Sequence, residues 1–284
     1  MSDSAPFDPA AVGAKSKPKR VSWNARDCMV YALGVGAGTD DLEFTTNNTR
    51  GVEQTMVPTM PVTLGVDFSV LKQAGRFDWA KLLHAEQRIE VLGAIPVDGE
   101  ADVVTEIVEM WDKEKAALIV AQTTGTSVAG DTLWRSSAGL FVRGVGGWGG
   151  SRGPASAPAV PAGGTGITKT VTYQTRTDQA LLYRLSGDYN PLHSDPAFAA
   201  RAGMDRPILH GLCTFGFAGR AVREVAGRDR KLASMNARFA GPVWPGDTLA
   251  VDVELVEDGS VRFAVRGRDD KEVLGGGSAT FVSA

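Results

Sequence analysis

The sequence has little of what disulfide, metal and membrane chemistry require. Its 284 residues include two cysteines, Cys28 and Cys213, and three histidines. The cysteines lie far apart without metal-ligand spacing, so we expect small buried thiols of a reducing, cytoplasmic compartment, although sequence alone leaves a disulfide open. No apolar run approaches the roughly 18 residues that cross a bilayer, so we expect a soluble protein with no membrane partner.

The sequence also lacks an excess of positive charge and an apolar leader. The net charge is −3 and the pI is near 5.7. Nucleic acid and anionic membranes are therefore not expected as partners. Residues 1–20 are rich in proline, alanine and lysine and contain no apolar signal segment, which predicts a flexible tail. The last residues, FVSA, are not a peroxisomal address.

The first half predicts a short helix followed by an antiparallel sheet. Asn24 precedes a helical stretch from Ala25 to Gly34, and no strand precedes the glycines that follow, so they do not form a dinucleotide-binding loop. Pro58 and Pro61 interrupt residues 51–67, which predicts strands or irregular core segments and no strong central helix. β-Rich runs joined by short turns occupy residues 81–92, 102–111, 116–125 and 131–142.

The second half predicts a helix followed by a similar sheet. A strand at 168–173 precedes an apolar helix from Leu212. Its small residues would let strands pack closely around it: Gly216, Ala218, Gly219 and Ala221. β-Rich runs follow at 232–239, 248–256, 260–268 and 272–282. This pattern predicts an α+β, tandem (double) hot-dog fold with antiparallel sheets wrapped around a central helix. The predicted parts are a tail (1–20), an N-terminal hot-dog-like domain (21–150), a linker (151–167) and a C-terminal hot-dog domain (168–284).

The most informative stretch is the polar run before that helix. Pro191 disfavours the helical region at Asn190, so a preceding helix should end before Asp188. A proline-fixed turn can direct the side chains of Asp188 and His193 toward one point, where a carboxylate and an imidazole can hold and deprotonate a water. A helix that starts at Gly211 would offer free N–H groups to an enolate-like oxygen.

The strings GDYNPLHSDPAFA and PILHGL carry a family resemblance. They are similar to the active-site signature of the R-specific 2-enoyl-CoA hydratases, which comprise hydratase 2, the MaoC-like dehydratases and the hydratase part of peroxisomal multifunctional enzyme type 2. The segments YALGVGAG, LLHAEQ, VDGE, FVRGVGGWGG and ARFAGPVWPGDTL resemble the same family. The resemblance covers nearly the whole chain and accounts for most of the support for the double hot-dog prediction.

The resemblance implies a reaction and roles for four residues. Asp188 and His193 would be the acid–base pair acting through one water, which Asn190 orients, while the Gly211 N–H polarises the thioester oxygen. The implied reaction is reversible syn hydration of trans-2-enoyl-CoA to (3R)-3-hydroxyacyl-CoA. No metal or redox cofactor is implied, since CoA is part of the substrate, and a homodimer is expected.

The resemblance also implies a set of substrate-binding residues. A His-Gly-Glu-Gln segment in the family contacts the acyl-CoA, and here alanine replaces its glycine, which adds a methyl group near that contact. Roles without substrate contact remain open for two of these residues: Lys113 as a solvated turn lysine and Phe239 as strand core. The implied substrate-binding residues are His84, Ala85, Lys113, Tyr189, Pro191, Leu192 and Phe239.

Three rival interpretations stay open at this point. A metal site has plausible ligands, but their spacing matches no known helical motif, so none is expected. A hot-dog thioesterase would need a general base on the central helix. A non-catalytic acyl-CoA-binding partner subunit would not need the intact set of catalytic residues. Sequence leaves open whether the acyl group is fatty, branched or a sterol side chain, and the physiological direction.

Overall fold

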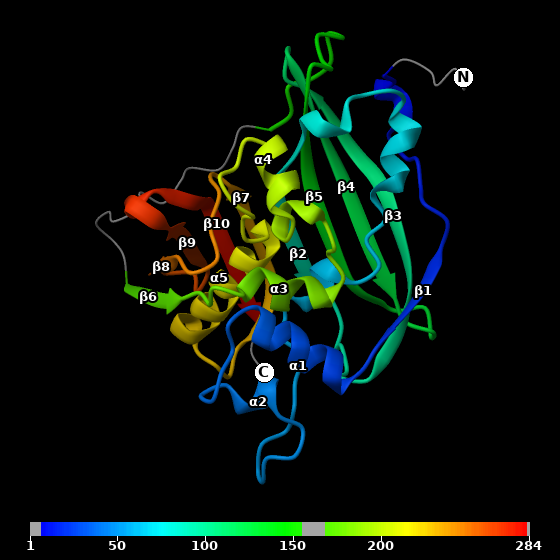
Figure 1. Ribbon diagram of the computed structural model, residues 1–284. Helices are drawn as coiled ribbons and strands as arrows, with labels where there is room; N and C mark the ends of the chain where they lie inside the picture. Colours follow the sequence, from blue (N-terminus) through cyan, green and yellow to red (C-terminus); the bar gives the residue numbers. More distant parts are fainter. Residues whose placement is uncertain (1–6, 155–167, 283–284) are drawn as a thin grey trace.

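The computed structural model describes residues 7–154 and 168–282, which fold around one ten-stranded antiparallel sheet (Figure 1). The strand order is β1-β3-β4-β5-β2-β7-β10-β9-β8-β6. The first five strands are β1 (Lys19–Trp23), β2 (Leu82–Val91), β3 (Gly99–Asp112), β4 (Ala116–Thr126) and β5 (Thr132–Arg143). The second five are β6 (Lys169–Gln174), β7 (Lys231–Phe239), β8 (Thr248–Leu255), β9 (Val261–Arg266) and β10 (Glu272–Val282).

The two halves of the sheet repeat one topology. Numbered from one to five in chain order, the strands of each half run 1-3-4-5-2 from the outer edge inward. The second strand of each half, β2 and β7, pair with each other and join the halves. Every neighbouring pair is antiparallel, as short turns and returning connections require. The α+β double hot-dog prediction is confirmed.

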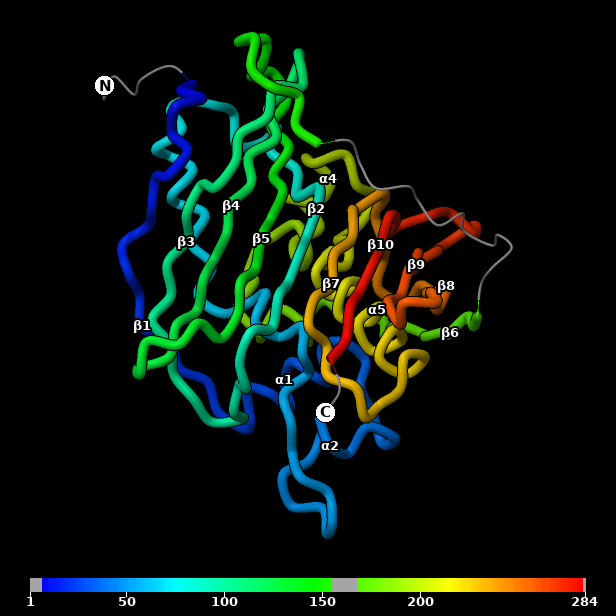
Figure 2. The backbone as a smooth tube through the Cα atoms, turned by 180° about the vertical axis from the view of Figure 1, so that it is seen from behind, coloured from blue at the N-terminus to red at the C-terminus, as the bar shows by residue number. Residues whose placement is uncertain are grey.

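The helices gather on one face of the sheet. They are α1 (Ala25–Gly34), α2 (Leu42–Thr45), α3 (Gln179–Tyr183), α4 (Pro196–Arg201) and α5 (Gly211–Ala226). Figure 2, from behind, shows the strands in front and the helices beyond them. The sheet of the second half wraps around α5, whose Phe215, Phe217 and Val222 are fully buried. In the part of the chain that the structure describes, no helix is both long and apolar enough to span a membrane.

The first half has no counterpart of α5, as its prolines predicted. Residues 51–67 are irregular apart from a 3₁₀ turn at Met60–Thr63, and a longer 3₁₀ segment follows at Phe68–Ala74. Val70 and Leu71 of that segment pack into a small cluster with strand residues of the first half. A 3₁₀ segment covers less of a sheet than a four-turn helix, so the concave face of this half is open enough for a cavity.

The prediction of a flexible tail over residues 1–20 is wrong for residues 7–20. The Asp8 N–H donates to the Ala74 carbonyl at 2.8 Å, the Gly13 N–H donates to Ile107 at 2.7 Å, and β1 pairs with β3. β1 was missed because it is an edge strand with exposed lysine and arginine, so its sequence lacks the apolar alternation of a buried strand. Residues 1–6 of that tail, and 155–167 of the predicted linker, lie outside the described residues.

The small residues of α5 accept parts of the first half as well as strands. A Cβ at Gly216 would lie 2.3 Å from Val35, just after α1, and one at Gly219 would lie 2.7 Å from Thr59. The prediction that these residues serve strand packing is therefore corrected for Gly216. Here first-half residues occupy part of the space beside the helix.

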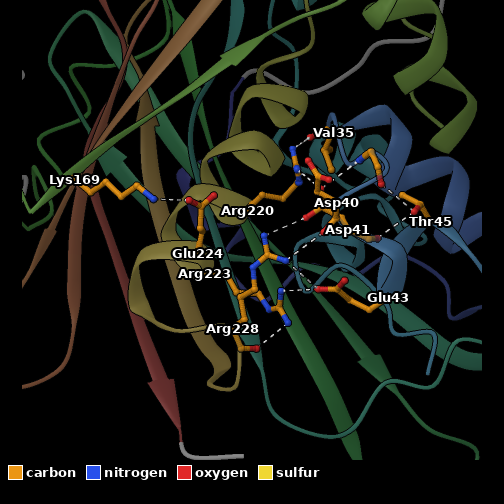
Figure 3. Close-up of polar contacts among 11 residues, drawn as sticks. Val35, Asp40, Asp41, Glu43, Thr45, Lys169, Arg220, Arg223, Glu224 and Arg228 are labelled. Atoms are coloured by element: carbon orange, nitrogen blue, oxygen red, sulfur yellow. Dashed lines mark hydrogen bonds and ion pairs between the residues drawn. The ribbon is translucent and has the colours of Figure 1, made fainter. Parts of the chain in front are cut away.

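Arginines on and after α5 form ion pairs with the segment that contains α2. Arg220 donates to Asp41 at 2.5 Å, and Arg223 lies 3.2 Å from Glu43 (Figure 3). The Arg220 and Asp41 side chains are only 10% and 11% exposed. These contacts join residues about 180 positions apart in the sequence. They link the two halves through α5 and the segment around α2, in addition to the pairing of β2 with β7.

Candidate active site

The polar turn folds as the sequence predicted. The helical run through α3 ends in a 3₁₀ turn at Ser186, and Gly187 then takes a φ of 116°, a left-handed conformation that favours glycine and redirects the chain into Asp188. Pro191 begins the next 3₁₀ turn, and the Asn190 side chain accepts a hydrogen bond from the Leu192 N–H at 3.0 Å. The Asp188 carboxylate accepts the Asn190 N–H at 3.1 Å. These local bonds fix the orientation of both side chains.

An acid and two imidazoles meet on this turn. One potential ligand atom from each of Asp188, His193 and His210 lies within 4.8 Å of the others. His193 Nδ1 lies 2.9 Å from the Ile208 carbonyl oxygen. Because a carbonyl oxygen only accepts, Nδ1 carries the hydrogen and Nε2 keeps its lone pair for a proton.

The environment keeps the His193 ring neutral near neutral pH. Burial lowers the pKa of His193, because desolvation disfavours the imidazolium; the Ile208 carbonyl and the nearby Asp188 carboxylate act in the opposite direction. The ring is 9% exposed. A neutral imidazole with a free Nε2 is the form that a general base requires.

His210 supports the turn from the side. Its ring stacks on that of His193 with centroids 3.7 Å apart and an interplanar angle of 28°. Its Nε2–H donates to the Asp188 carbonyl oxygen at 3.2 Å. Burial, together with a smaller effect of the neighbouring His193, lowers the pKa of His210 to about 4. These contacts give His210 a structural role beside Gly211.

Gly211 is the first residue of α5, as predicted, and it is exposed. In the described parts of the chain its N–H has no acceptor, which is expected for the first N–H of a helix. A Cβ at this position would lie 2.8 Å from the Phe239 ring. The N–H at the positive end of the α5 dipole is therefore free for an oxyanion, and the absent side chain leaves room for Phe239.

One cavity of about 800 Å³ collects these groups and draws its walls from both halves. Asp188, Asn190, His193 and Gly211 all line it. Four of the seven predicted substrate-binding residues line it too: His84, Ala85, Leu192 and Phe239. The four predicted catalytic residues come from the second half, while much of the remaining wall comes from the 3₁₀ segments and strands β2, β4 and β5 of the first half.

Three predicted substrate-binding residues do not line the cavity. Lys113 lies on the turn between β3 and β4 and donates to the Arg152 carbonyl. Tyr189 is 57% exposed with the Arg184 guanidinium 4.7 Å from its ring centroid. Pro191 is exposed and its carbonyl accepts the Asp195 N–H at 2.8 Å. Their contribution to substrate binding stays a prediction.

His84 and Ala85 lie at an irregularity in β2. The pairing with β5 shifts between His84 and Glu86, so Ala85 is the extra residue of a bulge, and such bulges redirect neighbouring side chains. The His84 ring packs against Phe239 at 4.9 Å, and its Nε2 is shut away from solvent without a hydrogen-bond partner in the described structure. Burial lowers the pKa of His84 to about 4, so the ring is neutral.

Sequence reasoning missed a polar part of the cavity wall. Thr123, Ser136 and Thr214 line it, and all three side chains are buried. Thr123 and Ser136 lie at buried positions of β4 and β5, in stretches where more buried and less buried residues largely alternate. That period of two could have revealed hydroxyl groups in otherwise apolar rows of the sheet.

Asp188, His193 and His210 are also the one metal-capable cluster in the described part of the chain. Their geometry fits a metal poorly. His193 Nδ1 and His210 Nε2 already engage carbonyl oxygens, and the remaining nitrogens belong to nearly parallel stacked rings. In-plane lone pairs of stacked rings do not converge on one point as tetrahedral coordination requires.

The fold and site define a class: a double hot-dog protein with an acid–imidazole pair and a free helix N–H in a large, largely apolar cavity. Comparison with known proteins identifies the family. Residues 160–275 match the MaoC like domain, and residues 21–144 match the MFE-2 hydratase 2 N-terminal domain. The chain belongs to the family of MaoC-like hydratase 2 proteins.

Individual relatives agree with this assignment. The chain is 42% identical to 3-hydroxyacyl-thioester dehydratase Y of Mycobacterium tuberculosis, covering 98% of this chain and 99% of the relative. It is 40% identical to the enoyl-CoA hydratase ChsH3 of the same organism, covering 86% and 87%. The crystal structure of a MaoC-like dehydratase from Phytophthora capsici superimposes with a TM-score of 0.84 at 30% identity, covering 96% and 97%.

Proposed function

We propose that the protein catalyses the reversible syn hydration of trans-2-enoyl-CoA to (3R)-3-hydroxyacyl-CoA. The observation that carries the proposal is the convergence of Asp188, His193 and the free Gly211 N–H on one cavity. Relatives that match nearly the whole chain are named as a 3-hydroxyacyl-thioester dehydratase and an enoyl-CoA hydratase, which supports it.

The geometry suggests how the reaction proceeds. A water between the Asp188 carboxylate and His193 Nε2 loses a proton to the pair as its oxygen forms a bond to C3. The electrons of the C2=C3 bond move toward the thioester, whose carbonyl oxygen accepts a hydrogen bond from the Gly211 N–H. The enolate then collapses as C2 takes a proton from the same pair. Delivery of both parts of the water from one face makes the addition syn, and the reverse sequence dehydrates.

The acyl chain is proposed to extend into the first half. The catalytic residues lie on the second half, whereas Val62, Phe68 and Leu140 of the first half line the same cavity. Because no long helix fills this half, the cavity has space for a medium-length or bulky chain. Shortening the acyl chain from medium to short should therefore lower kcat/KM, and an unchanged kcat/KM would contradict this placement.

The remaining properties of the reaction are proposed on chemical grounds. Hydration moves no electrons to an external acceptor, so we propose that no redox cofactor takes part. We also propose a reaction without a metal, which the poor metal geometry of Asp188, His193 and His210 supports. We further propose a cytoplasmic homodimer. Thioester hydrolysis is not favoured, because α5 presents Gly211, Leu212 and Thr214 to the cavity and none of them is a general base.

The direct test is hydration of crotonyl-CoA with chiral analysis of the product. Asp188→Ala and His193→Ala should each lower kcat/KM by roughly two orders of magnitude or more, the contribution of a positioned acid–base group. Asp205→Ala is the matched control, because it removes an exposed carboxylate of the same stretch outside the cavity lining. Wild-type-like activity in either variant, a 3S product or release of free CoA would refute the proposal.

A further inference from the structure

One part of the wall of the proposed acyl cavity is polar, although its side chains are buried. Gln87, Thr123 and Ser136 line the cavity and are 3%, 1% and 4% exposed. A purely hydrocarbon chain would leave polar groups in such a place without partners, which is unfavourable in a buried site. The donors and acceptors that these residues leave unpaired therefore indicate which chemical groups of a ligand the cavity can bind.

Counting hydrogens shows a free donor on Ser136. Its Oγ accepts the Gln87 Nε2–H at 2.9 Å. Its own hydroxyl hydrogen has no acceptor within hydrogen-bonding distance among residues 7–154 and 168–282. A serine hydroxyl both donates and accepts, so its donor is available to a molecule in the cavity.

Thr123 provides a second donor by the same reasoning. Its Oγ1 lies 2.9 Å from Oγ1 of Thr105, which already accepts the Asp67 N–H at 3.1 Å. Only one of the two hydroxyl hydrogens can lie between these oxygens. Thr105 is fully buried and does not line the cavity, so its hydroxyl is best satisfied by donating to Thr123. The Thr123 hydroxyl hydrogen then faces the cavity.

The two donors are neighbours and lie far from the reacting atoms. Thr123 pairs directly with Ser136 across β4 and β5, so their side chains project side by side. Ser136 is four residues along β5 from Leu140, which pairs with His84 beside Phe239, a separation of about 13 Å. The hydroxyl pair therefore lies at the distal part of the space proposed for the acyl chain.

We propose that Thr123 and Ser136 form a subsite for an acceptor oxygen, such as a keto group, carried on the distal part of the acyl chain. Two adjacent donors match the two lone pairs of a carbonyl oxygen. The substrate class is then an enoyl-CoA with an oxygenated tail rather than a plain hydrocarbon tail. This inference rests on the proposed hydratase function and specifies its substrate.

The test compares matched substrates in the full-length protein. Two series of trans-2-enoyl-CoA substrates of equal chain length are compared. One series has plain hydrocarbon chains, and the other carries a keto group at successive positions in the distal half of the chain. Crotonyl-CoA, which is too short to reach the subsite, reports the hydratase function by itself. For the best-placed keto group, kcat/KM should exceed that of the plain chain by about fivefold for each hydroxyl engaged, the effect of one ordinary hydrogen bond.

Two variants and one control assign the preference to these residues. Ser136→Ala and Thr123→Val should each reduce the keto preference by about fivefold. Ser137→Ala is the control, since it removes a hydroxyl from the opposite face of the same strand, outside the cavity lining. It should leave the preference intact.

The outcomes separate the two proposals. Failure to hydrate crotonyl-CoA would refute the hydratase function. Calorimetry would then compare the binding of saturated acyl-CoAs with and without a keto group, which tests the subsite by binding alone. Hydration of crotonyl-CoA without a keto preference would mean that the hydroxyls hold only water and would overturn the subsite. A preference that survives both Ser136→Ala and Thr123→Val would overturn the assignment to these residues.

Discussion

The imidazole of His193 lies face to face with that of His210, with ring centroids 3.7 Å apart. Each ring uses one nitrogen to donate to a backbone carbonyl, of Ile208 and of Asp188 respectively. These two hydrogen bonds fix the tautomer of the proposed base and hold the chain at Asp188 against the segment that leads into α5. The close stacking disfavours charge on both rings at once, since two adjacent imidazolium ions would repel each other.

The first prediction concerns the pH dependence of hydration. Burial lowers the pKa of His193 below its ordinary value of 6.5, and the neutral ring is the proposed base. As pH falls, activity should persist through 6.5 and decline only as it passes the lowered pKa, since the ring is protonated only there. A profile of kcat/KM against pH checks this. An inflection at or above 6.5 would show that the ring is not shielded in this way.

The second prediction separates positioning from catalysis at His210. His210→Phe keeps an aromatic ring against His193 but removes the donor to the Asp188 carbonyl. The turn should shift, and kcat should fall by about tenfold or more with little change in KM, because small displacements of catalytic groups are costly. His210→Gln can place an amide N–H near the position of Nε2 and should recover much of kcat. Equal kcat in the two variants would contradict a role for this hydrogen bond.

The third prediction isolates the Gly211 N–H. Gly211→Pro removes this donor at the first helical position, where proline is tolerated, and His210 with φ −59° and ψ 134° is in a conformation suited to precede proline. Gly211→Ala is the matched control, since it keeps the N–H and also places a carbon against Phe239. The proline variant should have a kcat lower than that of the alanine variant by about 10²-fold or more. Similar values would exclude this N–H as the oxyanion donor.

Much of the polar turn could be predicted from sequence because its geometry is local. Pro191 predicts that the helix ends before Asp188, and a helix that begins at Gly211 follows from the apolar spacing after it. No tertiary contact is needed for these inferences. The four proposed catalytic residues line one cavity, and their roles stay a prediction.

The parts that sequence did not predict depend on contacts between distant residues. β1 becomes a strand only because the edge of β3 accepts it, and its own residues are mostly exposed. The polar part of the cavity was missed for the same reason: Thr105, Thr123 and Ser136 are on three strands, and only the sheet register makes them neighbours. Gly216 was assigned to strand packing because sequence does not show that Val35 lies beside it.

The fourth prediction concerns the ion pair that fastens the halves on the side away from the shared sheet. The side chains of Arg220 and Asp41 are about nine-tenths buried and lie 2.5 Å apart. Figure 3 shows this contact between α5 and the segment around α2. Arg220→Met leaves the Asp41 carboxylate with the Gly38 N–H, at 3.3 Å, and Arg228 as the remaining cation, at 3.8 Å. Urea denaturation should show a loss of about 3 kcal/mol in the free energy of unfolding, because a buried charge loses its partner.

A double variant and a surface control complete this test. Adding Asp41→Asn to Arg220→Met removes the buried carboxylate charge that has lost its partner. The double variant should therefore be more stable than Arg220→Met alone. Arg262 forms a comparable 2.9 Å pair with Glu254, but its side chain is 48% exposed. Arg262→Met should therefore cost less than about 1 kcal/mol, since solvent screens an exposed pair. If the double variant were no more stable than the single one, the loss would come from packing of the Arg220 side chain on Tyr173, whose ring centroid is 4.9 Å from the guanidinium, rather than from charge.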